Sequence, residues 1–230
     1  MDVKSYILTK LLFKQSGNDN SFWKSYQDDG KRTDYSYAFR NAYWTNENFN
    51  PIYKAKVTKA YYTFTECKIT DYEKLASYFD FSNCPNLNYT FAHTSFTRLK
   101  ELNFTSATTA TSTFANSQKL HTIDKIVINS DGSFPFENKT FQSCFGLVEI
   151  RFEGIIGTSF YIHNSPKLSK ESIINIFEAL SSSTSAQSVN LSKEAVNAAF
   201  QTSTGLNNGT SSDEWQMLIA TKPNWTVNLT

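Results

Sequence analysis

Residues that could carry chemistry are sparse in this chain and lie far apart. The histidines are His93, His121 and His163, and none of them forms the i, i+4 pair that binds a metal on one helix face. No Cys pair has zinc-ligand spacing, and no H-E-x-x-H, G-x-x-x-x-G-K-S/T, G-x-G-x-x-G or G-x-S-x-G sequence occurs. We therefore expect no catalytic centre, no bound metal and no cofactor.

The cysteines and carboxylates also favour structural roles. Cys67, Cys84 and Cys144 are odd in number and unevenly spaced, which is not a disulfide framework, so we expect reduced thiols that pack as small side chains. Asp213 and Glu214 fall in a predicted first helical turn, where the helix dipole accounts for them. A polysaccharide-active enzyme needs two carboxylates that face one groove, and the sequence shows no such pair.

A repeated Thr-Phe pair marks the elements that would position any site. "TFTEC", "TFAHT", "TFANS" and "TFQSC" begin at Thr63, Thr90, Thr113 and Thr140, and each places Cys, Thr or Ser three residues after the Phe. The Phe residues recur at steps of 27, 23 and 27 residues along the chain. This period lies in the range of leucine-rich repeats, which run from about 20 to 29 residues.

Each repeat is predicted to end in a half-buried strand. Spaced aliphatic residues follow the later copies, in "SFTRLKELNF", "QKLHTIDKIVI" and "FGLVEIRFEG". One repeat cannot cover its own apolar edge, so stacked repeats would bury a shared ladder of Phe, Leu and Ile. The small residue three positions after each Phe is expected at a loop, where its side chain can bond to exposed backbone amides.

The pattern "TFxxC…L…I…F" resembles the BspA-like leucine-rich repeats, of the kind encoded by gut Firmicutes and their phages. The resemblance covers about residues 60–165, and the first repeat departs from it because "DYEKLASYF" inserts a helix-like segment. It implies a solenoid with a sheet on one face and a protein that binds partners, and it implies no reaction. The expected fold class is α/β: a short leucine-rich-repeat solenoid of about four rungs.

The ends of the chain are predicted to cap this solenoid. Residues 1–55 form an N-terminal helical and aromatic cap or attachment segment, 56–165 the leucine-rich repeats, and 166–230 a C-terminal, repeat-like helix-strand cap. In the last segment, "SKESIINIFEAL" is a predicted helix, and "SVNLSKEAVNAAF" is a strand followed by a helix capped by Ser192. "SSDEWQMLIATK" is a helix with a capping box that starts at Ser211, and "NWTVNL" is a final strand.

Bulk composition limits the kinds of partner. The formal net charge is +1 and no long block of like charge occurs, which argues against nucleic-acid binding. No stretch approaches the 18 or so apolar residues of a membrane span, so no membrane insertion is expected. Lys10 and Lys14 interrupt the apolar positions of the N-terminus, so we expect no signal peptide.

Three hypotheses for function remain. The leading one is a non-enzymatic binding or structural module of a bacteriophage virion, made in the host cytoplasm, as a tail or head decoration or in host attachment. The second is an intracellular protein-binding inhibitor or scaffold, with a bacterial surface adhesin as a related option; the third is a polysaccharide-active enzyme. The expected partners are a protein or cell-surface glycan and other virion proteins, and self-association into a homo-oligomer is a further option.

Outward-facing strand positions are the predicted partner-binding surface, because stacked repeats place them in rows across an open sheet. These positions are Glu101, Asn103, Thr122, Asp124, Glu149 and Arg151. The competing interpretation is that they are merely solvated sheet residues. Tyr43 and Trp44, in the aromatic N-terminal segment, are predicted as a second contact surface.

Overall fold

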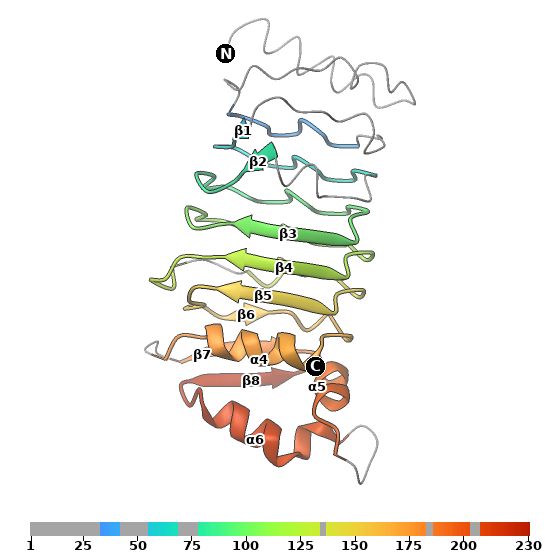
Figure 1. The fold of residues 1–230 in the computed structure, drawn as a ribbon, viewed down its shortest axis with the longest axis vertical. Helices are drawn as coiled ribbons and strands as arrows, with labels where there is room; N and C mark the ends of the chain where they lie inside the picture. The colour runs from blue at the N-terminus through green and yellow to red at the C-terminus, as the bar shows by residue number, and fades with distance from the viewer. Residues whose placement is uncertain (1–32, 42–54, 69–77, 134–136, 183–185, 203–207) are drawn as a thin grey trace, which may run out of the picture.

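The computed structural model shows a β-solenoid of about five parallel turns with few helices (Figure 1). It describes residues 33–41, 55–68, 78–133, 137–182, 186–202 and 208–230. Successive turns stack along the long axis, with the strand-rich turns followed by turns that contain helices (Figure 1).

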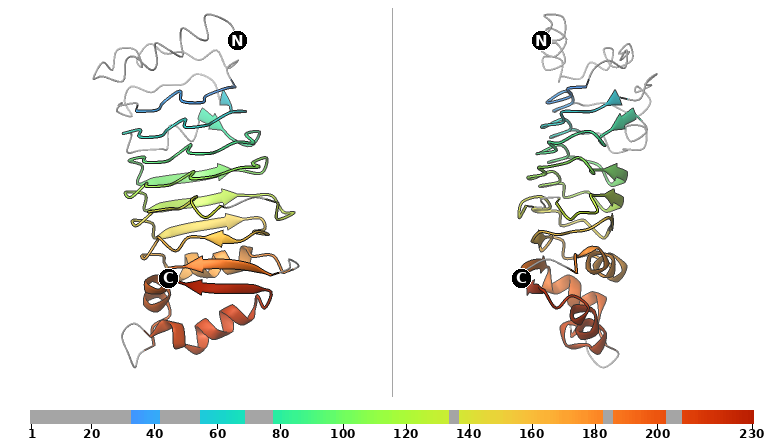
Figure 2. Two further views of the ribbon diagram at one scale, coloured as in Figure 1. Left: turned by 180° about the vertical axis from the view of Figure 1, so that it is seen from behind. Right: turned by 90° about the vertical axis from the view of Figure 1, so that its left-hand side faces the viewer.

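All strand pairings between named strands are parallel, and within each sheet the strands lie in chain order. The first sheet is β1 (Ala55–Lys56) with β2 (Phe79–Asp80). The second sheet consists of β3 (Arg98–Asn103), β4 (Thr122–Val127) and β5 (Glu149–Glu153). The third sheet consists of β6 (Phe160–Tyr161), β7 (Gln187–Leu191) and β8 (Trp225–Leu229). The side view in Figure 2 shows β3–β5 on one wall of the solenoid and β7–β8 on the opposite wall.

The helices lie in the C-terminal turns. They are α4 (Lys170–Ala179), α5 (Lys193–Ala199), the 3-10 helix η2 (Gly209–Ser211) and α6 (Asp213–Ala220). The three α-helices and the strands β7 and β8 confirm the elements predicted for this segment. The capping box was predicted one residue too early: Ser211 ends η2, so Ser212 takes the extended conformation of an N-cap and accepts the N–H of Trp215.

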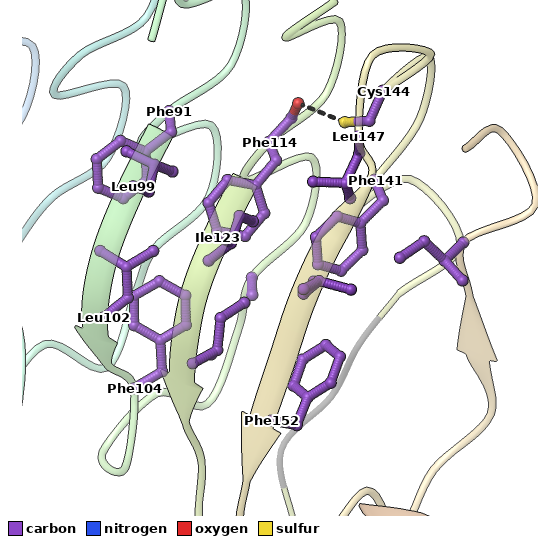
Figure 3. Close-up of a cluster of buried hydrophobic side chains, with 14 of the residues drawn as sticks. Phe91, Leu99, Leu102, Phe104, Phe114, Ile123, Phe141, Cys144, Leu147 and Phe152 are labelled. Carbon is purple, nitrogen blue, oxygen red and sulfur yellow. Dashed lines mark hydrogen bonds between the residues drawn. The ribbon is translucent and has the colours of Figure 1, made fainter. Parts of the chain in front are cut away.

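Phenylalanine rings form a continuous stack through the turns, part of which is drawn in Figure 3. The centroids of Phe64 and Phe91 lie 5.5 Å apart, those of Phe91 and Phe114 lie 5.7 Å apart, and those of Phe114 and Phe141 lie 5.1 Å apart. The planes of neighbouring rings differ by at most 19° and all four rings are buried. The predicted ladder is confirmed, and Phe39 extends it by a further ring at 5.4 Å from Phe64.

The Thr of each Thr-Phe pair joins its turn to the preceding one. Thr90 donates from Oγ1 to the carbonyl oxygen of Ala60 at 2.7 Å, and Thr113 donates to that of Leu87 at 3.0 Å. The other two copies of the pair make the equivalent contact. All four threonines are fully buried, so each hydroxyl pairs a backbone carbonyl that an apolar side chain would leave without this bond.

The residue three positions after each Phe lies outside the helices and strands, as predicted, but it is buried, so the prediction that its side chain bonds exposed backbone amides is wrong. Ser117 donates from Oγ to the carbonyl oxygen of Phe91 at 2.7 Å. Cys144 donates from Sγ to that of Phe114 at 3.1 Å, as the dashed line in Figure 3 shows. The side chain at this position is small and polar because it must fit inside the solenoid and bond the backbone carbonyl of the phenylalanine in the preceding turn.

Two residues of left-handed backbone flank the Phe in all of these turns but the last, which has one, Ser143. In one turn they are Tyr62 (φ 57°) and Glu66 (φ 59°), and the same pair of positions recurs along the solenoid. Between them, the N–H of Phe64 bonds the carbonyl of Thr90 in the next turn at 2.8 Å, and the N–H of Cys67 closes the local turn onto Phe64. Some backbone N–H groups thus bond to the next turn and others bond within their own turn, so successive turns are joined through their backbones without a regular strand.

Residues 33–41, which the sequence placed in the N-terminal cap, already carry a turn of this kind: Tyr35 and Phe39 are buried and bond the turn that follows. The predicted N-terminal helix lies outside the described residues, and so do Tyr43 and Trp44. The "DYEKLASYF" insert falls mostly outside them as well. β2 begins at Phe79, the last residue of this insert, and pairs in parallel with β1.

We expect Phe114→Ala to lower the free energy of unfolding by about 3–5 kcal/mol, because it removes a buried ring from the middle of the stack. Chemical denaturation followed by circular dichroism measures the change. Phe145→Ala is the matched control, since Phe145 is 46% exposed and its loss should change stability by less than about 0.5 kcal/mol. Equal effects of the two substitutions would contradict the importance of the stack.

Candidate binding face

The open face of the sheet β3–β5 carries six of the predicted partner-binding residues. Leu102, Ile123 and Ile150 are at most 1% exposed and point into the solenoid, as predicted. The intervening polar residues point outward: Glu101 and Arg151 are exposed, and the other four are half-buried.

The register brings only some of these residues together. Thr122 lies directly opposite Glu149, as the repeat alignment predicted. Glu101, however, lies opposite Lys125, and it is Arg98 that faces Thr122. Leu99 and Leu102 both point inward and are three residues apart, so the sequence permitted two alignments of β3, and the structure pairs Leu99 with Ile123.

A bulge between β4 and β5 hollows this face. Ile123 pairs with Ile150 and Ile126 pairs with Phe152, so two residues of β4 face the single residue Arg151 of β5. Beside the bulge lies an open hollow of about 320 Å³. Its lining consists of Thr122, Ile123, Asp124, Glu149 and Arg151. Four of the six sheet-face residues predicted from the sequence therefore share one depression.

Asp124 is held by an arginine that the sequence did not single out. The guanidinium of Arg98 on β3 donates from Nε to Oδ1 at 2.9 Å and from Nη2 to Oδ2 at 2.8 Å. Such a two-point pair fixes both the position and the plane of the carboxylate. Only the stacking of turns brings Arg98 and Asp124 together, so the correct alignment of β3 was needed to find this contact.

Glu149 is held from the other side by the start of α4. Ser169 and Ser172 donate hydroxyl hydrogen bonds to its Oε2 at 3.0 and 3.2 Å. The hydrogen bonds found among the described residues leave Oε1 of Glu149 without a partner, so this oxygen can accept from a ligand. The hollow thus has two carboxylates, which sequence inspection failed to pair because they lie on different strands.

The helix α4 occupies the place of a next strand beside β5. The N–H of Ile150 donates to Oγ of Ser172 at 3.0 Å, and the N–H of Phe152 donates to Oδ1 of Asn175 at 2.7 Å. These side chains pair the edge of β5 that would otherwise offer free backbone groups. The side view in Figure 2 shows α4 continuing the wall that β3–β5 form.

Arg151 differs from the other charged residues of this face. Lys125 bridges Glu101 and Glu153 at 3.0 Å each, and hydrogen bonds to Glu153 and Glu101 raise its pKa. Arg151 is exposed and forms no ion pair with any residue that the structure describes. Arg151 lines the hollow, and no ion pair among the described residues uses its guanidinium donors.

The described residues contain no group of three or more His, Cys, Asp or Glu side chains that could hold a metal ion. Cys67, Cys84 and Cys144 are free and buried. Burial raises the pKa of the Cys84 and Cys144 thiols to about 12, which keeps both protonated near neutral pH and unreactive as nucleophiles. In the part of the chain that the structure covers, no helix has the length and apolarity to cross a membrane.

The protein is therefore a β-solenoid of about five parallel turns, and the sheet on one of its walls is polar and has a hollow. Comparisons with protein-family models, curated proteins and solved structures found no match to this chain.

We expect Cys144→Ser to reduce the loss of stability at alkaline pH. Burial raises the pKa of Cys144 from 9.0 to about 12, so between these values the unfolded chain loses a proton that the folded chain keeps. Stability therefore falls as pH rises through this window, by about 1.4 kcal/mol at pH 10 for this thiol. Urea unfolding at pH 7.5 and pH 10, with a reductant, measures the fall.

Serine fits the position, because Ser117 already occupies it one turn earlier and makes the same hydrogen bond. Burial also raises the pKa of Cys84 and Tyr62 to about 12, but these groups are common to both proteins and cancel in the comparison. An identical alkaline loss in the wild type and in Cys144→Ser would show that the Cys144 thiol does not carry the effect.

Proposed function

We propose that the protein is a non-enzymatic binding module that holds a protein or a cell-surface glycan on the open face of β3–β5. The observation that carries the proposal is the hollow itself, in which Arg151 has no ion-pair partner among the described residues while the carboxylates around it are already held. Arginine suits bidentate recognition of carboxylates and other planar acceptors, and a guanidinium without an ion-pair partner keeps its donors for such a ligand.

The contacts of the two carboxylates favour binding over glycoside hydrolysis. A glycosidase needs one of its carboxyl groups to be protonated so that it can act as the general acid. Both oxygens of Asp124 accept from Arg98, and Glu149 accepts from two serine hydroxyls. Donors of the protein therefore already occupy both oxygens of Asp124 and one oxygen of Glu149, which leaves these carboxylates few contacts for a scissile bond and an attacking water.

A BspA-like leucine-rich-repeat origin is the finer proposal for the fold. It is supported by the Thr-Phe repeat at steps of 27, 23 and 27 residues, by parallel strands that follow chain order, and by strand-helix turns toward the C-terminus. On this origin rests the further proposal that the protein is a bacteriophage virion component, with other virion proteins as partners. The alternatives are an intracellular inhibitor or scaffold and a bacterial surface adhesin.

Mass spectrometry of density-purified phage particles tests the virion assignment. We expect peptides of this chain in the particle band, at a constant ratio to the major capsid protein across the gradient. Recovery only from the soluble lysate fraction would favour the intracellular alternative, and recovery from the surface of uninfected cells would favour the adhesin.

We expect Arg151→Ala to weaken partner binding by about tenfold or more, because it removes charge-assisted hydrogen bonds worth about 1.5–3 kcal/mol. Its melting temperature should stay within about 1 °C of the wild type, since Arg151 is exposed and no ion pair is lost. The measurement is surface plasmon resonance of immobilised protein against bacterial polysaccharide fragments and recombinant virion proteins. Glu149→Ala is less suitable, because it also removes the acceptor of Ser169 and Ser172.

The exposed Lys139 lies in a Thr-Phe turn away from the sheet, so Lys139→Ala is the charge-matched control and should bind as the wild type does. Intact binding by Arg151→Ala, with binding lost in Tyr43→Ala or Trp44→Ala, would transfer the contact surface to the N-terminal segment.

A further inference from the structure

We propose that the hollow between β4 and β5 is a subsite for a single acidic sugar, a uronic acid whose carboxylate pairs with Arg151. The inference rests on the proposed binding function and goes further by naming the chemical class of the ligand. It follows from the charge, the hydrogen-bonding groups and the size of the hollow.

The charge of the hollow selects an anion of low charge. The guanidinium of Arg151 presents paired donors on a plane, which matches the two oxygens of a carboxylate. Asp124 and Glu149 line the same hollow and repel a second negative charge. Arg98 already neutralises Asp124, so a monoanion meets Arg151, which has no ion-pair partner in the described part of the chain, and the held carboxylate of Glu149, whereas a phosphate dianion meets additional repulsion.

The remaining polar groups favour a ligand that carries hydroxyl groups. Oε1 of Glu149 is an acceptor without a partner among the described residues, and Thr122, whose hydroxyl is hydrogen-bonded to Nδ1 of His121 at 3.1 Å, lies in the same lining. A sugar hydroxyl donates to such a carboxylate oxygen, and the oxygen of a hydroxyl that is already paired can still accept a second hydrogen bond. A uronic acid offers these hydroxyls within one ring of its carboxylate.

The apolar content of the hollow argues against the other common source of a carboxylate, the C-terminus of a peptide. Recognition of a peptide end uses pockets that accept its side chains. Here Ile123 is the single apolar residue of the lining. The volume of about 320 Å³ is at the lower end for small-molecule sites, which suits one sugar unit of a longer chain.

The two carboxylates of the hollow are held in place before a sugar binds. Arg98 fixes Asp124 from β3, and Ser169 and Ser172 fix Glu149 from the start of α4. Groups held in this way lose little rotamer freedom on binding, so the hollow is preorganised on regular elements rather than on loops.

Two-dimensional ¹H–¹⁵N NMR titration of the full chain tests the proposal, with methyl β-D-glucuronide and methyl α-D-galacturonide as probes. Methyl β-D-glucoside, acetate and glucose 6-phosphate are the comparison ligands, which separate the ring, the carboxylate and a dianionic phosphate. We expect at least one uronide to shift the amide signals of Thr122, Asp124, Glu149 and Arg151. Its affinity should exceed that of every comparison ligand by about tenfold or more.

Arg151→Ala should weaken uronide binding by about tenfold or more, whereas Lys139→Ala should leave it unchanged. Arg151→Lys should fall between the wild type and Arg151→Ala, because lysine keeps the charge but loses the planar pair of donors. If the spectrum of Arg151→Ala shows that β5 is disturbed, Arg151→Lys serves as the variant in which binding is compared.

Uronide binding that is unchanged in Arg151→Ala, or absent at saturating probe, overturns the acidic-sugar subsite. If the glucoside or glucose 6-phosphate binds instead in an Arg151-dependent way, the ligand class is wrong and the binding face stands. The proposed function is tested separately: it is wrong if no polysaccharide fragment or virion protein binds the wild-type chain in the surface plasmon resonance measurement.

Discussion

The stacking of the turns from Phe39 to Phe141 depends on one constraint: each turn must present to the next a phenylalanine ring in the same place and backbone groups in hydrogen-bonding register. The stacked rings from Phe39 to Phe141 supply the apolar part of that match. The buried Thr hydroxyls and the alternate N–H groups supply the polar part, by pairing carbonyls of the neighbouring turn. Because both parts lie inside the solenoid, the outer face of the strands takes no part in them and its residues are free to vary.

The same constraint explains tyrosines in a backbone conformation that bulky residues avoid. Tyr37, Tyr62 and Tyr89 occupy equivalent places in successive turns with φ of 57–60°, where a side chain costs about 1–3 kcal/mol. Their rings stack in parallel, with centroids 5.3 and 4.4 Å apart, and Arg40 lies over the ring of Tyr62. Such aromatic and cation–π contacts return about 0.5–1.5 kcal/mol each. The turn geometry imposes the strain, and the repetition of the turn provides the contacts that offset it.

The sequence predicted the repeats well where identical residues recur, and less well where only geometry recurs. The four Thr-Phe pairs located the ring ladder, but the turn at "YAFRN" was missed because Ala38 stands in place of Thr beside Phe39. The sequence correctly predicted which strand residues point inward, yet Leu99 and Leu102 left the register of β3 against β4 ambiguous. The ion pair to Arg98 depended on that register and was therefore out of reach. The leucine-rich-repeat origin and the binding function remain proposals, because they rest on resemblance and on unpaired groups rather than on a bound partner.

The position of the hollow follows from the change from strands to a helix along one wall. Up to β5, neighbouring strands lie about 4.8 Å apart and their charged side chains match across turns, as Glu101, Lys125 and Glu153 do. At the next turn α4 replaces the strand, and a helix with its side chains is about 10–12 Å across. The surface therefore rises beside β5, and the serines at the start of α4 donate hydrogen bonds to Glu149. On its other side, β4 bulges and Asp124 turns to Arg98. Arg151 lies between these two boundaries and has no ion-pair partner among the described residues, so its guanidinium, like Oε1 of Glu149, can be paired by a ligand.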